Sequence, residues 1–191
     1  MAKPIDLDGF EAMFAADPDP WGYAASPFER FKRRILMEAV GTRMYGRGLE
    51  LACANGENSA VLGSKCLRLL ALDGSPTALA IARDRNRATP RIRFAEAVLP
   101  GGMPRGPFDL IVVSELLYYI APNDLQVMLA RLRAAVAAGG RIVFLHHFLD
   151  FDDAATPPAL VAEAVERAFA AGFRVGYRAR TGRFDAVAFD R

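Results

Sequence analysis

The chain has 191 residues, a formal net charge of +2 at pH 7 and 52% hydrophobic residues. That length suits one domain with a sizeable core, and the hydrophobic content excludes an intrinsically disordered chain. The small net charge gives no overall case for binding nucleic acid, since proteins that do so usually present a basic face. We therefore expect one soluble domain over residues 1–191 and no nucleic-acid partner.

The cysteines and the apolar segments indicate a location. Cys53 and Cys66 form no disulfide framework or metal-ligand pattern, which fits a reducing cytoplasm. The N-terminal segment has early acidic residues and no long apolar core, so it does not resemble a signal peptide. No run of about eighteen apolar residues occurs, because Ser114 and Glu115 interrupt the most apolar segment. We predict a cytoplasmic protein without a membrane partner or a metal.

The first two elements expected are helices. Residues 6–16 look like a short amphipathic helix, and residues 28–40 follow Ser26 as a helix cap and Pro27 in the first turn. An extended, proline-bearing loop with the only tryptophan, Trp21, connects them.

Strands and helices then alternate, which predicts a parallel sheet covered on both faces. The expected strands are 48–52, 67–73, 92–97, 108–114 and 141–147. The expected helices are 58–66, 76–87 and 123–138. Asn58 or Ser59 could cap the first of these helices, and the Gly139-Gly140 pair would end the last in a left-handed cap.

The C-terminal part departs from this alternation. A helix is expected at 158–171, followed by strands at 173–179 and 183–189. The link between these strands is so short that they must be antiparallel. The predicted fold class is therefore α/β: a Rossmann-like, mostly parallel seven-stranded sheet with an antiparallel C-terminal strand and helices on both faces.

The most informative segment is 48–62, GLELACANGENSAVL. It reads as a strand, a tight loop with small residues at Ala52, Ala54 and Gly56, and a helix start. A second strand follows and ends in Asp73, an acid that can accept two hydrogen bonds from a ribose diol. The loop alone would also fit an ordinary turn between parallel strands in another α/β protein.

The loop lacks the glycines that receive a pyrophosphate in dinucleotide-binding proteins. Glu50 in the first strand would repel phosphate and would suit a cationic ligand or an α-ammonium group. The pattern resembles motif I of class I S-adenosylmethionine (SAM) methyltransferases, with two of the usual glycines replaced by alanines.

Ligands of open α/β sheets bind beyond the carboxyl ends of the strands. The strand-end segments that follow from this rule are Ala52–Gly56 with Cys53, Asp73–Ser75 with Gly74, Ala97–Val98, Ser114–Tyr119 and His146–Asp150. Glu115 could take a proton or hold a substrate ammonium, and Tyr118 could orient a nucleophile. Tyr118 and Tyr119 could equally pack against the next helix, and Asp73 could cap one, although Ser75 could fill that role.

His146 and His147 end a predicted strand, where neighbouring side chains point to opposite faces. At most one of them should therefore face the crevice. A histidine base near neutral pH would suit proton removal, and we name His146 with Glu115 and Tyr118 as the catalytic candidates. Simple packing is the alternative for either histidine.

Five segments together resemble the nodulation protein S (NodS) type of SAM-dependent methyltransferase: DPWGYAASPFERFKRRIL, LELACANGENSAVL, LLALDGSPTALAIAR, FDLIVVSELLYYI and AAGGRIVF. The resemblance covers roughly residues 19–144. It implies methyl transfer from SAM, with S-adenosylhomocysteine (SAH) as product, to a small molecule such as an amino-sugar nitrogen.

The resemblance also implies site residues. Glu50, Ala52 and Gly56 would lie in the methionine-binding loop, Asp73 would bind the ribose, and Ser114 and Glu115 would lie near the sulfonium. The segment 21–30, from Trp21 to Arg30, would belong to an N-terminal lid formed by residues 1–40 over a core of residues 46–191. Val98 replaces an acid that binds adenine in many relatives, so backbone or Glu96 would take that role.

Other functions remain open. The acceptor could be a hydroxyl, which would make the protein an O-methyltransferase of a small metabolite. A non-catalytic SAM-binding module is a second alternative, and a nicotinamide or flavin oxidoreductase a third that Glu50 and the missing phosphate glycines disfavour. The sequence does not predict an oligomeric state.

Overall fold

A computed structural model describes residues 4–191, so the first three residues of the predicted lid segment lie outside the described residues. Its centre is a seven-stranded sheet with the order β3-β2-β1-β4-β5-β7-β6. The strands are β1 (Tyr45–Leu51), β2 (Cys66–Asp73), β3 (Ile92–Glu96), β4 (Phe108–Ser114), β5 (Val136–His147), β6 (Arg174–Arg180) and β7 (Phe184–Asp190). β7 runs antiparallel to both of its neighbours, whereas the other pairs are parallel. The predicted sheet is thus confirmed.

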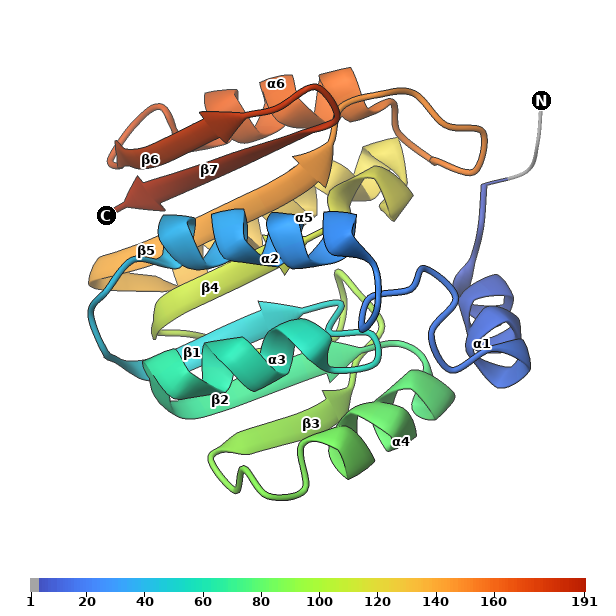
Figure 1. Ribbon diagram of the computed structural model, residues 1–191. Helices are drawn as coiled ribbons and strands as arrows, with labels where there is room; N and C mark the ends of the chain where they lie inside the picture. The colour runs from blue at the N-terminus through green and yellow to red at the C-terminus, as the bar shows by residue number, and fades with distance from the viewer. Residues whose placement is uncertain (1–3) are drawn as a thin grey trace.

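Helices cover both faces of this sheet (Figure 1). They are α1 (Leu7–Ala16), α2 (Pro27–Val40), α3 (Glu57–Leu62), α4 (Pro76–Arg85), α5 (Pro122–Ala135) and α6 (Pro158–Phe169), with short 3₁₀ turns η1 (Gly63–Lys65) and η2 (Leu117–Tyr119). Figure 1 shows α2 and α3 in front of the sheet and α5 behind it. α1 lies beside the layers, at the end where the parallel strands finish.

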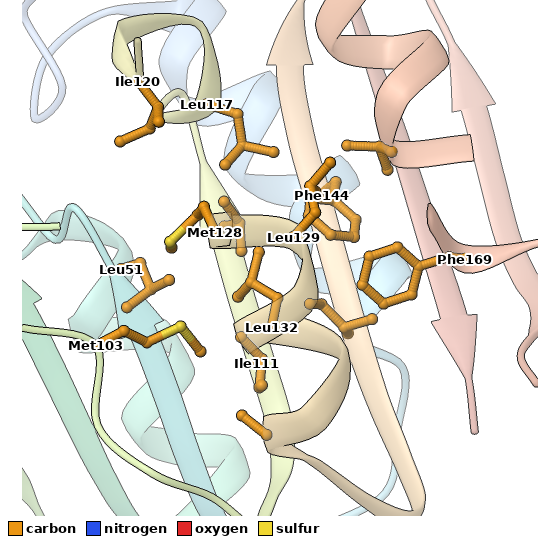
Figure 2. Packing of buried hydrophobic residues seen from close by; sticks show 14 of the residues in the cluster. Leu51, Met103, Ile111, Leu117, Ile120, Met128, Leu129, Leu132, Phe144 and Phe169 are labelled. Carbon is orange, nitrogen blue, oxygen red and sulfur yellow. The ribbon is translucent and has the colours of Figure 1, made fainter. Parts of the chain in front are cut away.

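Each face of the sheet has its own apolar cluster. One cluster joins β1, β4 and β5 to α5 and α6, and Figure 2 shows Met128, Leu129 and Leu132 of α5 packed toward Ile111 and Phe144. The other cluster includes buried residues of α2, α3 and α4, among them Leu36, Leu62 and Leu79. The inner strands are therefore buried on both sides, which explains their continuous apolar sequences.

The helix starts follow local sequence signals with one exception. Ser26 accepts hydrogen bonds at the start of α2, as predicted. For α3 the predicted cap at Asn58 or Ser59 is wrong, because Gly56 precedes the helix with φ of 79° and no side chain caps it. A Cβ at Gly56 would lie 2.9 Å from Cβ of Ala82. The turn therefore needs glycine both for its positive φ and for its lack of a side chain.

Two predicted boundaries also differ. Cys66 opens β2 and does not belong to the preceding helix. α5 ends at Ala135, so the predicted left-handed helix cap at Gly139 is wrong, although its φ is indeed positive at 69°. Residues 136–140 belong to β5 because they pair with the chain end: Gly139 N donates to Arg191 O (3.1 Å) and Arg191 N to Gly140 O (2.9 Å).

The strand order fixes where a ligand can bind. The chain builds β1, β2 and β3 toward one edge and then places β4 on the other side of β1. The loops after β1 and β4 therefore leave the sheet in opposite directions, which opens a crevice between their carboxyl ends.

Candidate functional site

A cavity of about 640 Å³ lies at this crevice, within the size range of small-molecule sites. Its wall includes residues at the ends of, or in the loops after, β1, β2, β3, β4 and β5. Its cover comes from α1 and the loop that follows, which contribute Phe10, Phe14, Trp21 and Tyr23. The predicted Trp21 loop therefore lies over the crevice.

The loop after β1 keeps a glycine-like backbone although its residues are alanines. Ala52 and Ala54 have φ of 54° and 48°, in the left-handed region that L-residues avoid. The loop is held in this form because Cys53 N donates to Leu72 O (2.9 Å). Both alanines line the cavity, so the backbone stays open to a ligand.

Asp73 is half-buried at the end of β2 and also lines the cavity. Its Oδ2 accepts from Ala54 N (2.8 Å) and its Oδ1 from Ser75 N (2.9 Å). Burial raises the pKa of Asp73 against these hydrogen bonds. Because a carboxylate oxygen accepts two hydrogen bonds, each oxygen retains capacity for a ligand hydroxyl.

Glu50 lies elsewhere than predicted, since it does not line the cavity. It is 1% exposed and accepts a hydrogen bond from the Ser59 hydroxyl of α3 at 2.5 Å. Burial raises the pKa of Glu50 to about 8, against the opposing effect of that hydroxyl. In this arrangement the Glu50 carboxylate faces α3 and not the cavity.

Glu115 is the centre of a charged cluster at the end of β4. Its φ is 52°, which is strained for a side chain of this kind. Lys32 Nζ of α2 lies 3.1 Å from Oε1, His147 Nδ1 lies 3.0 Å from both oxygens, and the Tyr118 hydroxyl donates to Oε2. Burial alone would raise the pKa of Glu115, but the His147 hydrogen bond, the Lys32 charge and Tyr118 lower it to about 2.

His146 and His147 have different surroundings, because neighbouring side chains of a strand point to opposite faces of the sheet. His147 lines the cavity, whereas His146 does not. Nε2 of His146 accepts from Leu117 N (3.4 Å), its ring packs edge-on against Tyr118, and burial lowers the pKa of His146 to about 4. The structure therefore brings His147, and not the predicted His146, to the Glu115 carboxylate, whereas His146 contacts the Tyr118 ring.

The remaining predicted residues divide into two groups. Among them the cavity is lined by Gly74, Ala97, Ser114 and Tyr118, in addition to those above. The others do not line it: Gly56, Ser75, Glu96, Val98 and Arg30. Val98 is 55% exposed, and Arg30 is an exposed residue of α2 that donates to Ala25 O in the preceding loop.

Cys53 lies at the side of the cavity. It lines a small adjoining pocket with Asn55 and Glu57, and burial raises the pKa of its thiol. Ser75 caps α4 by accepting from Ala78 N (2.9 Å), which was the alternative weighed for Asp73.

Sequence reasoning missed Lys32. Lys32 is only 6% exposed, and its ammonium group pairs with the carboxylates of Glu29 (3.0 Å) and Glu115. In the sequence it looks like a solvated lysine of an amphipathic helix. Its position in the second turn after the Ser26 cap, where α2 points toward the strand ends, was the available signal.

Among residues 4–191 no group of three or more His, Cys, Asp or Glu residues could hold a metal ion. In the same range no helix is long and apolar enough to cross a membrane.

The sequence matches a family of methyltransferase domains over residues 49–140. It is 32% identical over 132 residues to nodulation protein S of Rhizobium tropici and 30% identical over 131 residues to that of Sinorhizobium fredii. Both alignments cover 68% of this chain but 55% and 61% of the relatives. The chain thus spans little more than half the length of these curated relatives.

Solved structures agree with the sequence matches. The crystal structure of the N-methyltransferase NodS from Bradyrhizobium japonicum WM9, in complex with SAH, superposes with a TM-score of 0.81 over 97% of both chains at 24% identity. A protein of Pseudomonas syringae, provisionally described as a methyltransferase, has a TM-score of 0.71 and 31% identity over 86% of this chain and 99% of its own. The fold is therefore that of class I methyltransferases.

Proposed function

We propose that the protein transfers a methyl group from SAM to the nitrogen of a small-molecule amine, because the chain is a NodS-like member of the class I methyltransferase family. The single observation that carries this proposal is the covered cavity between the ends of β1 and β4, with the half-buried Asp73 in its wall. A methyl acceptor of NodS type, such as an amino-sugar, is the substrate class that we favour.

The residues present fit SAM. The two carboxylate oxygens of Asp73 suit the ribose diol, and Gly74 and Ala97 line the wall beside them. Ala52 and Ala54 expose backbone where the methionine part would bind, and Ser114 and Glu115 lie across the crevice from them. Bound SAM supplies a methyl group on a sulfonium, which a nucleophile attacks in line.

Such a displacement depends mainly on alignment and on exclusion of water. We propose that α1 and the loop after it, residues 7–26, form the lid that provides both. Phe10 packs edge-on against Tyr119 at 4.9 Å and Phe14 against Trp21 at 5.5 Å, so the cover is apolar on its inner side. The aromatic rings also suit a cationic group beneath them.

The side chains that line the cavity favour an amine as the methyl acceptor. The carboxylates of Asp124 and Asp153 line the cavity together with the rings of Tyr23 and Tyr119, while those of Glu29 and Glu115 pair with Lys32. Carboxylates and aromatic faces attract an ammonium ion, whereas a neutral hydroxyl would gain little from them. A hydroxyl acceptor is the second candidate, and a non-catalytic SAM-binding module is the third.

Turnover tests the reaction. The protein is incubated with SAM and, in separate reactions, with glucosamine, deacetylated chitin oligosaccharides, ethanolamine, simple phenols and acceptor-free buffer. We expect SAH to form with at least one amine and its methylated product to be seen by mass spectrometry. Methylation of the phenols alone would replace the amine by a hydroxyl acceptor. SAM binding without turnover of any compound would favour the non-catalytic module.

Cofactor binding is tested separately by calorimetry with Asp73→Ala. Loss of a charged hydrogen-bonding pair should weaken SAM binding by about 2 kcal/mol, or roughly thirtyfold in Kd. Asp84→Ala is the control, because Asp84 is a surface acid of α4 paired with Arg87. An unchanged Kd for Asp73→Ala would place the ribose elsewhere.

A further inference from the structure

The geometry assigns proton removal to His147: we propose that its Nε2 accepts the proton of the acceptor amine while Glu115 holds the ring through Nδ1. This inference rests on the proposed function and identifies the group that prepares the nucleophile. His147 would be a catalytic residue, and Glu115, which acts through it, a positioning residue.

Glu115 is unsuited to take the proton itself. Its oxygens already face Nδ1 of His147, the backbone N of His147 (3.3 Å), the Tyr118 hydroxyl and the Lys32 ammonium. A carboxylate with so many donors is stabilised in its charged form. Its pKa, which burial would raise but these donors lower to about 2, agrees with this arrangement.

His147 has the geometry that a base needs. Its Nδ1 is 3.0 Å from Glu115, so in the neutral ring Nδ1 carries the hydrogen and Nε2 offers a lone pair. The side chain lines the cavity and is 31% exposed. Among residues 4–191 no hydrogen-bond partner occupies Nε2, so this nitrogen is open to a ligand.

The charged groups around the ring come from several elements. Glu115 follows β4, Lys32 and Glu29 belong to α2, and Arg183, in the turn before β7, lies 5.3 Å from the Phe28 ring that contacts His147. The buried Lys32 ammonium disfavours a positive charge on an amine that binds nearby, so the amine is favoured in its neutral, nucleophilic form. Glu115, 3.0 Å from Nδ1, stabilises the imidazolium that forms on His147.

An acceptor that arrives as an ammonium ion gives one proton to Nε2 of His147, and the amine nitrogen regains its lone pair. That pair forms the N–CH₃ bond as the S–CH₃ bond breaks, and sulfur keeps the electrons of the broken bond. The imidazolium then releases its proton to water, which restores neutral His147.

His147→Asn tests the assignment with an amine that the wild type methylates. The asparagine amide can still donate to Glu115 but has no Nε2. We expect kcat to fall by roughly a hundredfold or more, the rising limb of kcat/KM against pH to disappear, and added imidazole to restore part of the rate. The Kd for SAM by calorimetry and the circular dichroism spectrum should stay unchanged.

Glu115→Gln tests the positioning role. It should lower kcat less than His147→Asn and shift the rising limb of the pH profile, because it changes the basicity of a ring that is still present. Wild-type kcat and an unchanged pH profile in a folded His147→Asn protein would overturn the assignment while the methyltransferase function stands.

A spectroscopic test needs no turnover. The chain has two histidines, so ¹⁵N-histidine labelling yields two imidazole spin systems, and His146→Gln identifies which is which. With SAH bound at alkaline pH we expect His147 to be protonated at Nδ1 and bare at Nε2, a preference that Glu115→Gln removes. Protonation at Nε2 would overturn the inference. Absence of turnover on all amines would instead count against the proposed function alone.

Discussion

Ala52 and Ala54 stand where class I methyltransferases usually have glycine, yet their backbone has kept the left-handed conformation. For an alanine this conformation costs on the order of 1 kcal/mol or more. The hydrogen bonds of Cys53 and Ala54 to the end of β2 hold the loop against that strain. The chain therefore retains an open loop at some cost in stability.

Replacement of Ala54 by glycine should relieve part of this strain. We expect the free energy of unfolding to rise by about 1 kcal/mol and Tm by roughly 2–4 °C, measured by thermal unfolding. The matched control is Ala80→Gly in α4, an exposed helical alanine whose replacement should lower stability by about 1 kcal/mol. Equal losses in both variants would contradict the strain argument.

Glu50 makes the stability of the protein depend on pH. Burial raises its pKa to about 8 in the folded state, so between about pH 4.5 and 8 the folded protein binds this proton more tightly than the unfolded chain. The contribution of protonated Glu50 is therefore present at low pH and lost as pH rises through 8. Deprotonation in the core should cost on the order of a few kcal/mol.

Glu50→Gln cannot lose a proton and should remove this dependence. We expect the variant to match the wild type near pH 4.5, to become increasingly more stable as pH rises to about 8, and to keep a constant advantage above that, as measured by urea unfolding of the ligand-free protein. Glu38→Gln, an exposed acid of α2, is the control for charge. A stability difference that stays constant from pH 5 to 9 would show that Glu50 keeps an ordinary pKa.

Among the elements, α1 is joined to the start of α4 by the side chain of Glu11. Glu11 accepts hydrogen bonds from the Ser75 hydroxyl (2.5 Å), from Thr77 N (3.2 Å) and from the Thr77 hydroxyl. The Ser75 and Thr77 bonds lower the pKa of Glu11, whose carboxylate lies at the N-terminal end of α4 where negative charge is favourable. The proposed lid is thus joined to the helix that follows the ribose acid.

Glu11→Ala should let the lid open more readily. We expect SAH to dissociate several-fold faster, measured by stopped-flow displacement, while the free energy of unfolding changes little. Asp8→Ala removes an exposed acid from the same helix and serves as the control. Unchanged dissociation in Glu11→Ala would mean that α1 does not control exit of the ligand.

The elements also show what could be predicted from the sequence. Hydrophobic periodicity and the cap signals predicted the helices, the sheet and its antiparallel strand, because they depend on local pattern. The end of α5 was wrong, since the pairing of Gly139 and Gly140 with Arg191 is a contact between distant parts of the chain. Motif I predicted the loop and Asp73, and their proposed roles stay predictions.

The same limit applies within the site. Alternation predicted that one of the two histidines faces the crevice, but the choice depends on the register of β5, where His147 pairs with Phe184 of β7. Lys32 reaches Glu115 across a sequence separation that no local pattern encodes. The assignment of functional roles therefore needed the tertiary structure even where the motif was clear.

At the scale of the molecule, the N-terminal segment serves two structural purposes. α1 and the loop to residue 26 cover the cavity, whereas Leu36, Ala39 and Val40 of α2 are buried in the core. Arg141 of β5 donates a hydrogen bond to Ala39 O (2.9 Å) near the end of α2, and it forms an ion pair with Asp190 of β7 (2.7 Å). α2 is thus part of the folded layer and α1 is not.

Two truncations should separate these parts. A protein lacking residues 1–25 retains the Ser26 cap and α2, so we expect a cooperative unfolding transition and a native-like circular dichroism spectrum. Its Kd for SAM should rise by roughly tenfold or more, since one lost apolar side-chain contact already accounts for about 1.5 kcal/mol. A protein lacking residues 1–40 exposes the core beneath α2 and should not unfold cooperatively.

The outcome distinguishes a lid from a structural helix. If removal of residues 1–25 abolished the folding transition, α1 would be required for the fold and the proposed division of the segment would be wrong. If that truncation bound SAM as tightly as the full chain, the apolar wall of Phe10, Phe14 and Trp21 would make no contribution to binding. Loss of affinity in a chain that still unfolds cooperatively is the result that the separate packing of α1 and α2 predicts.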